Sequence, residues 1–187
     1  LRDLILQKNT LETKIQLYNT IISTKEGYSE GVKEILRDQK KYPYVMGVLA
    51  ELIEIESPYQ SAVELVLGEF AQYLIVKTRE NAHKLIKNTT QQLSVISLDS
   101  ISDIELNKRK YPAKRLLSVI TFKKKLDKLM NILIGNVCIL PKGHTQPSPD
   151  NINQYDWVSK TGKYFNSGYI FKSPDQSNPI IGRQNKL

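Results

Sequence analysis

Apolar side chains recur at heptad spacing along the first 26 residues. With Leu1, Lys8, Ile15 and Ile22 as a positions and Leu4, Leu11, Tyr18 and Lys25 as d positions, six of the eight sites are apolar or aromatic. This pattern predicts a helix with a short coiled-coil seam, ended by Gly27. The alternative is an amphipathic helix packed on a globular core, and a span this short leaves both interpretations open.

The next 70 residues alternate between helical and strand patterns. Pro58 stands at the start of an apolar-faced helix, and Gly47 lies within an apolar strand. The predicted order is helix ("SEGVKEILRDQKK"), strand ("YVMGVLAELIEI"), helix ("YQSAVELVLGEF"), strand ("QYLIVK"), helix ("RENAHKLIKNTT") and strand ("QLSVISL"). A β-α-β order of this kind predicts an α+β (mixed α/β) fold, with a small mixed or parallel sheet covered by helices.

The character of the chain changes after Asp103. A basic segment at 107–128 runs into a predicted helix, "KKKLDKLMNILIG", that ends near Gly135, and the strand "NVCIL" follows. A polar loop, "PKGHTQPSPDNINQ", then leads into alternating residues that predict a β-hairpin turning at Thr161-Gly162. We therefore expect two subdomains, with the boundary near residues 100 to 115.

Composition favours a cytoplasmic protein with acidic partners. The chain carries a net charge of +8 and a single cysteine, and its longest nearly apolar run, "NILIGNVCIL", is about half of a membrane span. The charged start shows no signal peptide, so we expect no membrane association. The first residue is not Met, from which we expect a piece of a longer chain.

No enzymatic motif is present, and we expect no cofactor and no metal. Phosphate-binding loops and nucleophile elbows are absent from the sequence. Cys138 and His144 are the only nucleophile and base close in sequence, but Cys138 sits in an apolar strand, which favours a buried structural thiol. His83 lies on a predicted helix with no second ligand at metal spacing. A small enzyme using Cys138 and His144 remains a weak alternative.

The basic segment is the candidate for contact with nucleic acid. It holds nine basic residues against one acid, Asp127. The basic residues are Lys108, Arg109, Lys110, Lys114, Arg115, Lys123, Lys124, Lys125 and Lys128. We expect sequence-independent, salt-sensitive contact with the phosphates of double- or single-stranded DNA, and a solvated charged face is the alternative. Neutral substitutions at 123–125 should then flatten the dependence of binding on salt.

The last hairpin is the candidate for a contact between protein chains. It holds more apolar surface than a monomer should leave on an edge strand, although a core-facing strand pair is the alternative. The strand within "EFAQYLIVK" is expected to supply a second edge, so that strand addition builds a two-fold dimer. The candidate interface residues are Tyr73, Ile75, Tyr164, Phe165, Gly168, Tyr169, Ile170 and Phe171.

The order of elements from about Gly27 to Gly182 resembles the hinge domain of bacterial-type SMC (structural maintenance of chromosomes) proteins. The residues that carry the resemblance are Gly47, Tyr59, Ala62 with Glu64, and Leu67-Gly68, followed by "LSVISLDSI", "LMNILIGNVCIL" and "WVSKTGKYFNSGYIF". One departure concerns the strip after the last hairpin, where the family is rich in glycine. Here only Gly168 and Gly182 remain, which puts the detail of a close dimer contact in doubt.

The resemblance implies a domain layout and a mechanical function. Residues 1–26 would be the end of an incoming coiled-coil arm, 27–106 and 107–182 the two hinge subdomains, and 183–187 the start of the outgoing arm. The domain would pair, most simply with itself, to join two arms of a chromosome condensation and segregation ATPase in the cytoplasm, at the nucleoid. The ATPase heads would lie elsewhere in the full chain. The alternatives are pairing with a different chain, or a basic nucleic-acid-binding domain that acts as a monomer.

Overall fold

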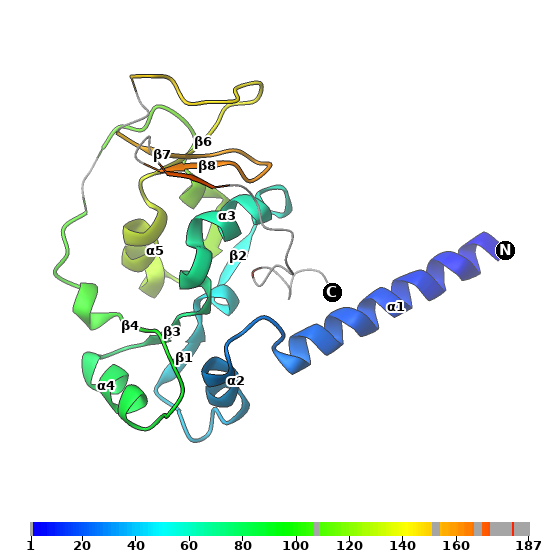
Figure 1. The fold of residues 1–187 in the computed structure, drawn as a ribbon, viewed down its shortest axis with the longest axis vertical. Helices are drawn as coiled ribbons and strands as arrows, with labels where there is room; N and C mark the ends of the chain where they lie inside the picture. Colours follow the sequence, from blue (N-terminus) through cyan, green and yellow to red (C-terminus); the bar gives the residue numbers. More distant parts are fainter. Residues whose placement is uncertain (1, 107–108, 151–153, 167–169, 173–180, 182–187) are drawn as a thin grey trace.

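The computed structural model describes residues 2–106, 109–150, 154–166, 170–172 and 181. Its first element, the helix α1 (Arg2–Thr24), stands away from the rest of the molecule (Figure 1). The helix stops before the glycine expected to end it, because Lys25 already has a positive φ of 52°. Gly27, with φ of 84°, lies in the turn that follows. The predicted long helix is therefore confirmed, with an earlier end.

The first sheet has three strands and contains the predicted β-α-β unit. Its order is β1 (Val45–Val48), β3 (Leu74–Val76) and β4 (Val95–Ser97), and β3 runs parallel to β4 but antiparallel to β1. The helix α4 (Arg79–Lys87) makes the crossover between the parallel strands. The side chain of Thr78 caps its start by accepting from the N–H of Asn81 at 3.2 Å.

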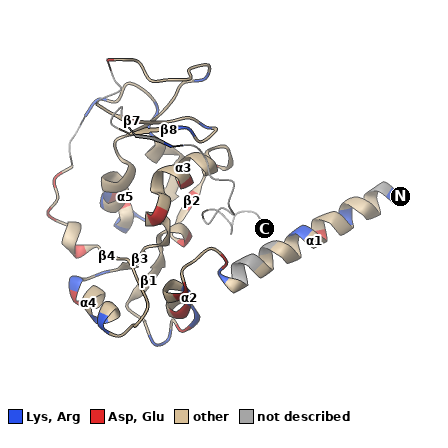
Figure 2. Cartoon of the chain, in the orientation of Figure 1, with Lys and Arg blue, Asp and Glu red and all other residues tan. Residues whose placement is uncertain are grey.

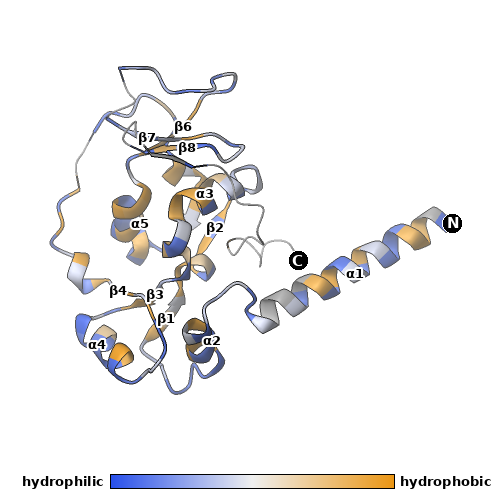
Figure 3. Ribbon diagram, in the orientation of Figure 1, coloured by the Kyte–Doolittle hydropathy of each residue, from blue (hydrophilic) through white to orange (hydrophobic). Residues whose placement is uncertain are grey.

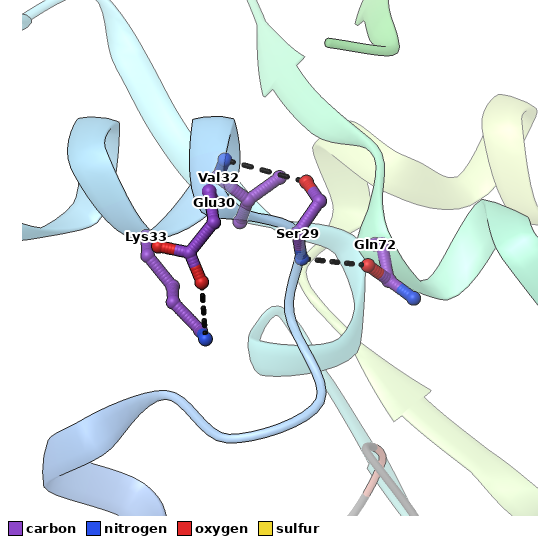
Figure 4. Close-up of polar contacts among 5 residues, drawn as sticks. All are labelled: Ser29, Glu30, Val32, Lys33 and Gln72. Atoms are coloured by element: carbon purple, nitrogen blue, oxygen red, sulfur yellow. Dashed lines mark hydrogen bonds and ion pairs between the residues drawn. The ribbon is translucent and has the colours of Figure 1, made fainter. Parts of the chain in front are cut away.

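The helix α2 (Glu30–Arg37) covers the same region and begins at a side-chain cap (Figure 4). The hydroxyl of Ser29 accepts from the N–H of Val32 at 3.5 Å, and the N–H of Ser29 donates to Gln72 at 3.1 Å. Gly31 allows close packing, since a Cβ there would lie 2.7 Å from Leu93 Cδ2. The helix is thus fixed both at its start and along its buried face.

A two-stranded ribbon joins the two halves of the sequence. The strand β2 (Ile53–Ile55) pairs antiparallel with β5 (Ile120–Phe122), so residues on either side of the expected subdomain boundary share one ladder. The helices α3 (Gln60–Leu67) and α5 (Asp127–Ile134) pack beside this ribbon (Figure 1). Gly135 follows α5, as the sequence predicts.

The second half forms a four-stranded sheet with the order β6-β7-β8-β9. These strands are Val137–Ile139, Asp156–Val158, Tyr164–Asn166 and Ile170–Lys172. The predicted hairpin is present as the antiparallel pair β7–β8, and Gly162 supplies the positive φ of 81° in its turn. Short 3-10 helices fill the connections at Leu49–Glu51, Ser57–Tyr59, Gly68–Gln72, Asp99–Ile101, Leu116–Val119 and Lys124–Leu126.

One continuous hydrophobic core runs through both halves. It collects buried residues from α2 to Ile181, including Leu74, Leu116 and Val158, and the apolar segments gather inside the body (Figure 3). A smaller cluster covers the opposite face of the four-stranded sheet, where Cys138, Trp157 and Phe165 lie in one row across neighbouring strands. The predicted mixed α and β fold is confirmed, while the division into subdomains stays a prediction.

Candidate functional site

The apolar side chains described on α1 face solvent. Leu4, Leu11 and Ile15, three members of the predicted heptad seam, are 68%, 59% and 45% exposed. Leu6 and Leu17, which lie outside this seam, are exposed to a similar extent. The alternative interpretation, a helix packed on the globular core, is therefore wrong for these residues. Exposed apolar side chains in such number are unusual for a surface helix, and the coiled-coil seam stays a prediction.

The junction between α1 and the body is fixed by a half-buried ion pair. Lys25 Nζ lies 2.6 Å from Glu51 Oε1, and the Tyr28 hydroxyl approaches the same oxygen at 3.5 Å. Tyr28 is buried in the main core. Charges that are partly removed from water interact more strongly than exposed pairs. The turn that follows α1 is thus tied to Glu51 of the body through Lys25.

The far end of the chain is held by α3. Ile181 is fully buried in the main core, and both of its backbone groups are bonded to side chains one helical turn apart. Gln60 Nε2 donates to the Ile181 carbonyl at 2.6 Å, and the Ile181 N–H donates to Glu64 Oε1 at 2.9 Å. This arrangement, which we call the exit clamp, was not predicted from the sequence. A pair of isoleucines, Ile180 and Ile181, in a turn-rich strip shows no helical or strand periodicity that would mark it as buried.

The residues that carry the family resemblance have structural roles in this chain. Gly47 and Gly68 have φ of 136° and 51°, values that favour glycine, and the β1–β3 register shifts between Val45 and Gly47. Ala62 and Leu67 are buried residues of α3 itself. The glycines thus allow the backbone turns of the first sheet and of the end of α3, and the buried residues pack α3 against the core. Glu64 instead belongs to the exit clamp.

The sheet topology corrects one expectation about the contact between chains. The strand β3 is paired on both sides, with β1 and with β4, so the prediction that it supplies a free edge is wrong. The sequence alone does not distinguish a central apolar strand from an edge. Tyr73 is half-buried and Ile75 is completely buried, and their contact with a partner stays a prediction. The edge strands of this sheet are β1 and β4.

The other predicted edge is present. The strand β9 pairs with β8 alone among the described strands, so it is one of the two outer strands of the four-stranded sheet. Tyr164 and Phe165, on β8, are buried against the chain's own core on opposite sides of the sheet. Ile170 and Phe171 belong to β9, whereas Gly168, Tyr169 and the glycine-poor strip with Gly182 lie outside the described residues.

Tyr164 shows how strongly the inner face of this sheet is shielded. Its side chain is 5% exposed, and burial is the main reason that its pKa rises to about 12. The negative charge of Asp156 acts in the same direction, while a hydrogen bond from Asn166 opposes it. A neutral phenol in this position belongs to the core of the domain rather than to a free surface.

The basic residues of the predicted segment are spread along the backbone rather than gathered at one place (Figure 2). The Arg115 side chain contacts its own domain. It donates to the Gly135 carbonyl at 3.2 Å and to Asn131 Oδ1 at 2.9 Å. Its guanidinium carbon also lies 4.5 Å from the centre of the Tyr111 ring. Lys128 donates to the Ser102 carbonyl. These two side chains are engaged within the chain and contribute less to a free surface.

The remaining described cations separate into two groups. Lys123, Lys124 and Lys125 are exposed between β5 and α5, at the 3-10 helix Lys124–Leu126. Arg109, Lys110 and Lys114 are exposed before that strand, and Lys108 lies outside the described residues. In the folded chain Lys160 lies near Lys114, although it is far from the basic segment in sequence and was not predicted as a site residue. Its ammonium approaches the same tyrosine ring as that of Lys114.

The candidate catalytic residues lack the environment of a reactive centre. Cys138 is fully buried, and burial raises the pKa of its thiol, the opposite of what a nucleophile requires. His83 and His144 are exposed. Within the described ranges, no group of three or more His, Cys, Asp or Glu residues is arranged to hold a metal ion. Over the same residues, no helix combines the length and apolarity needed to cross a membrane.

Comparisons with known proteins agree with the architecture. The family described as "SMC proteins Flexible Hinge Domain" matches residues 42–142. The chromosome partition protein Smc of Bacillus subtilis is 24% identical over 192 residues, which cover 94% of this chain but only 16% of that protein. An asymmetric dimer of the Geobacillus stearothermophilus SMC hinge domain has a similar fold, with a TM-score of 0.82, 19% identity, and coverage of 99% of this chain and 80% of that one. The Pyrococcus furiosus SMC hinge domain matches with a TM-score of 0.66, 19% identity, and coverage of 81% and 83%.

Proposed function

Since the chain belongs to the family of SMC flexible hinge domains, we propose that it dimerises and thereby joins two coiled-coil arms of a bacterial chromosome partition ATPase. The observation that carries this proposal is the helix α1, which stands away from the folded body and exposes apolar side chains between Leu4 and Leu17. The chain spans about a sixth of the length of the Bacillus subtilis relative. The arms and ATPase heads of the whole protein, and its place at the nucleoid in the cytoplasm, are parts of this proposal.

The dimer contact is proposed to form by strand addition. The outer strand β9 leaves one row of backbone groups without a described partner strand, and such an edge is a template for another chain. The edge that it meets on the second copy is β4, since β1 is interrupted by the irregularity at Gly47 and bulges discourage pairing. Two equivalent β9–β4 contacts would be related by a two-fold axis. The Geobacillus relative, which is a hinge dimer, supports self-association.

The test is the molar mass of the chain in solution, by size exclusion with light scattering. We expect a mass near twice 21.4 kDa. The variants Ile170→Asp and Phe171→Asp place a charge on either face of β9 and should each give monomers, with an unchanged far-UV spectrum. Thr161→Asp, in the exposed β7–β8 turn, is the matched control and should stay dimeric. A wild-type mass near 21.4 kDa at high concentration would contradict self-pairing and favour either a different partner chain or a monomeric nucleic-acid-binding domain.

A second proposed function is non-specific contact with DNA. It is supported by the net charge of +8 and by three consecutive exposed lysines, Lys123, Lys124 and Lys125, which lie between β5 and α5. Each lysine that neutralises a phosphate adds about 0.9 to the slope of log affinity against log salt. Replacing all three by Gln should therefore flatten that slope, and an unchanged slope would refute the contact.

A further inference from the structure

Two lysines from distant parts of the chain converge on one buried tyrosine. Lys114 Nζ lies 5.2 Å and Lys160 Nζ 4.7 Å from the centre of the Tyr59 ring. The two ammonium groups are therefore at most about 10 Å apart. Lys114 precedes the 3-10 helix Leu116–Val119, and Lys160 lies in the turn between β7 and β8. This pairing exists only in the folded chain.

Both ammonium groups are available to a ligand. Both lysine side chains are exposed, and neither takes part in any ion pair among the residues that the structure describes. A ring within about 6 Å attracts a cation and holds it in place without neutralising its charge. Tyr59 thus positions two positive charges at the surface, although Tyr59 itself is only 8% exposed.

The backbone holds both lysines in fixed positions. The Lys114 carbonyl accepts from the N–H of Ile139 on β6 at 2.8 Å. The turn that carries Lys160 is closed by the N–H of Gly162, which donates to the Ser159 carbonyl at 3.0 Å. The backbone positions of the two lysines are thus set by the four-stranded sheet, and the ring that both ammonium groups approach belongs to the 3-10 helix Ser57–Tyr59.

We propose that Lys114 and Lys160 form a phosphate-contacting subsite for the backbone of duplex DNA. Duplex DNA carries one negative charge per about 1.7 Å of axis, so cations up to about 10 Å apart can meet separate phosphates. The buried Tyr59 ring offers no platform for base stacking, which single-strand binding requires. The subsite rests on the DNA contact proposed above and is distinct from the lysines at 123–125, which follow β5 rather than precede it.

The test measures binding of a fluorescent duplex of about 30 base pairs by anisotropy, between about 50 and 200 mM salt. We expect Lys114→Gln and Lys160→Gln each to lower the slope of log affinity against log salt by about 0.9, and the double variant by about twice that. Lys160→Arg, which keeps both the charge and the ring contact, should match the wild type. Lys163→Gln is the matched control, because Lys163 is exposed in the same hairpin but is described over no ring.

The outcomes separate this subsite from the broader proposal. If the Gln variants change the slope no more than Lys163→Gln does, while the triple variant at 123–125 flattens it, the subsite is refuted and the DNA contact stands. If the wild-type protein does not bind the duplex at about 50 mM salt, both fail. If a single-stranded oligonucleotide, or vesicles containing phosphatidylserine, show the full slope change and the duplex does not, the assignment to duplex DNA is overturned.

Discussion

The exit clamp predicts that a residue near the end of the chain contributes to the stability of the whole domain. Ile181 is fully buried in the main core, although most residues close to it in sequence are polar. Ile181→Ala removes buried apolar volume, which costs about 2–5 kcal/mol of unfolding free energy when the site cannot collapse. The backbone bonds to Gln60 and Glu64 keep position 181 in place, so we expect little collapse and a loss of about 3 kcal/mol.

This loss is measurable by urea unfolding at fixed protein concentration. Trp157 is the single tryptophan and is 4% exposed, so its fluorescence reports unfolding of the four-stranded sheet. For a domain of this size, about 3 kcal/mol also corresponds to a fall of roughly 6–12 °C in Tm. Ile86→Ala is the matched control, since Ile86 is 53% exposed on α4 and should change stability by less than about 0.5 kcal/mol.

The hydrogen bonds of the clamp give a second, smaller effect. Gln60→Ala removes the donor to the Ile181 carbonyl and should cost about 1 kcal/mol. In combination with Ile181→Ala the two losses should not be additive, because both changes act on the same anchored residue. Equal stability of Ile181→Ala and Ile86→Ala would refute the reasoning, since it would mean that the segment at Ile181 does not belong to the cooperative core.

Three other predictions follow from particular contacts. Gly31→Ala should destabilise by about 1–2 kcal/mol despite the better helix propensity of Ala, because its Cβ would lie 2.7 Å from Leu93 Cδ2; a higher urea midpoint would contradict this. Cys138 should react with a maleimide only as fast as the chain unfolds, because its thiol is buried and its pKa is raised; labelling at the rate of a free thiol would refute this. Tyr164 stays protonated in the folded state up to its pKa of about 12, whereas an unfolded tyrosine ionises near pH 10, so unfolding free energy should fall by about 3 kcal/mol between these values. Tyr164→Phe should lose that part of the pH dependence in urea titrations.

Most of the elements could be predicted from local patterns. The helix at 2–24, the strand–helix–strand unit from Leu74 to Ser97 and the hairpin turning at Gly162 each depend on residues close in sequence. Apolar periodicity, caps and positive-φ glycines act over one or two turns, so one sequence suffices to locate them. The helix end was predicted at Gly27 but lies at Thr24, because Lys25 itself adopts the left-handed conformation.

The functional surfaces were predicted less well, because they depend on which strands meet. An apolar run such as 74–76 looks the same in the centre of a sheet and at its edge, and the structure places it in the centre. Nine basic residues close in sequence were predicted to act as one patch, yet the Arg115 guanidinium donates hydrogen bonds to Asn131 and Gly135 of its own domain. Side-chain direction and partner choice are set by segments far away in the chain.

The type and order of most helices and strands follow from local patterns in the sequence, although β5 was not predicted and β1 and β2 were predicted as one strand. The resemblance to SMC hinges and the excess of positive charge are also evident from the sequence. The fold was needed to establish that β9 and β4 are outer strands among the described residues, that Lys160 joins Lys114 at Tyr59, and that Ile181 is buried against α3. The difference lies in the range of the interactions. Backbone conformation and apolar periodicity are local, whereas burial, strand pairing and the convergence of charges arise when distant segments share one core.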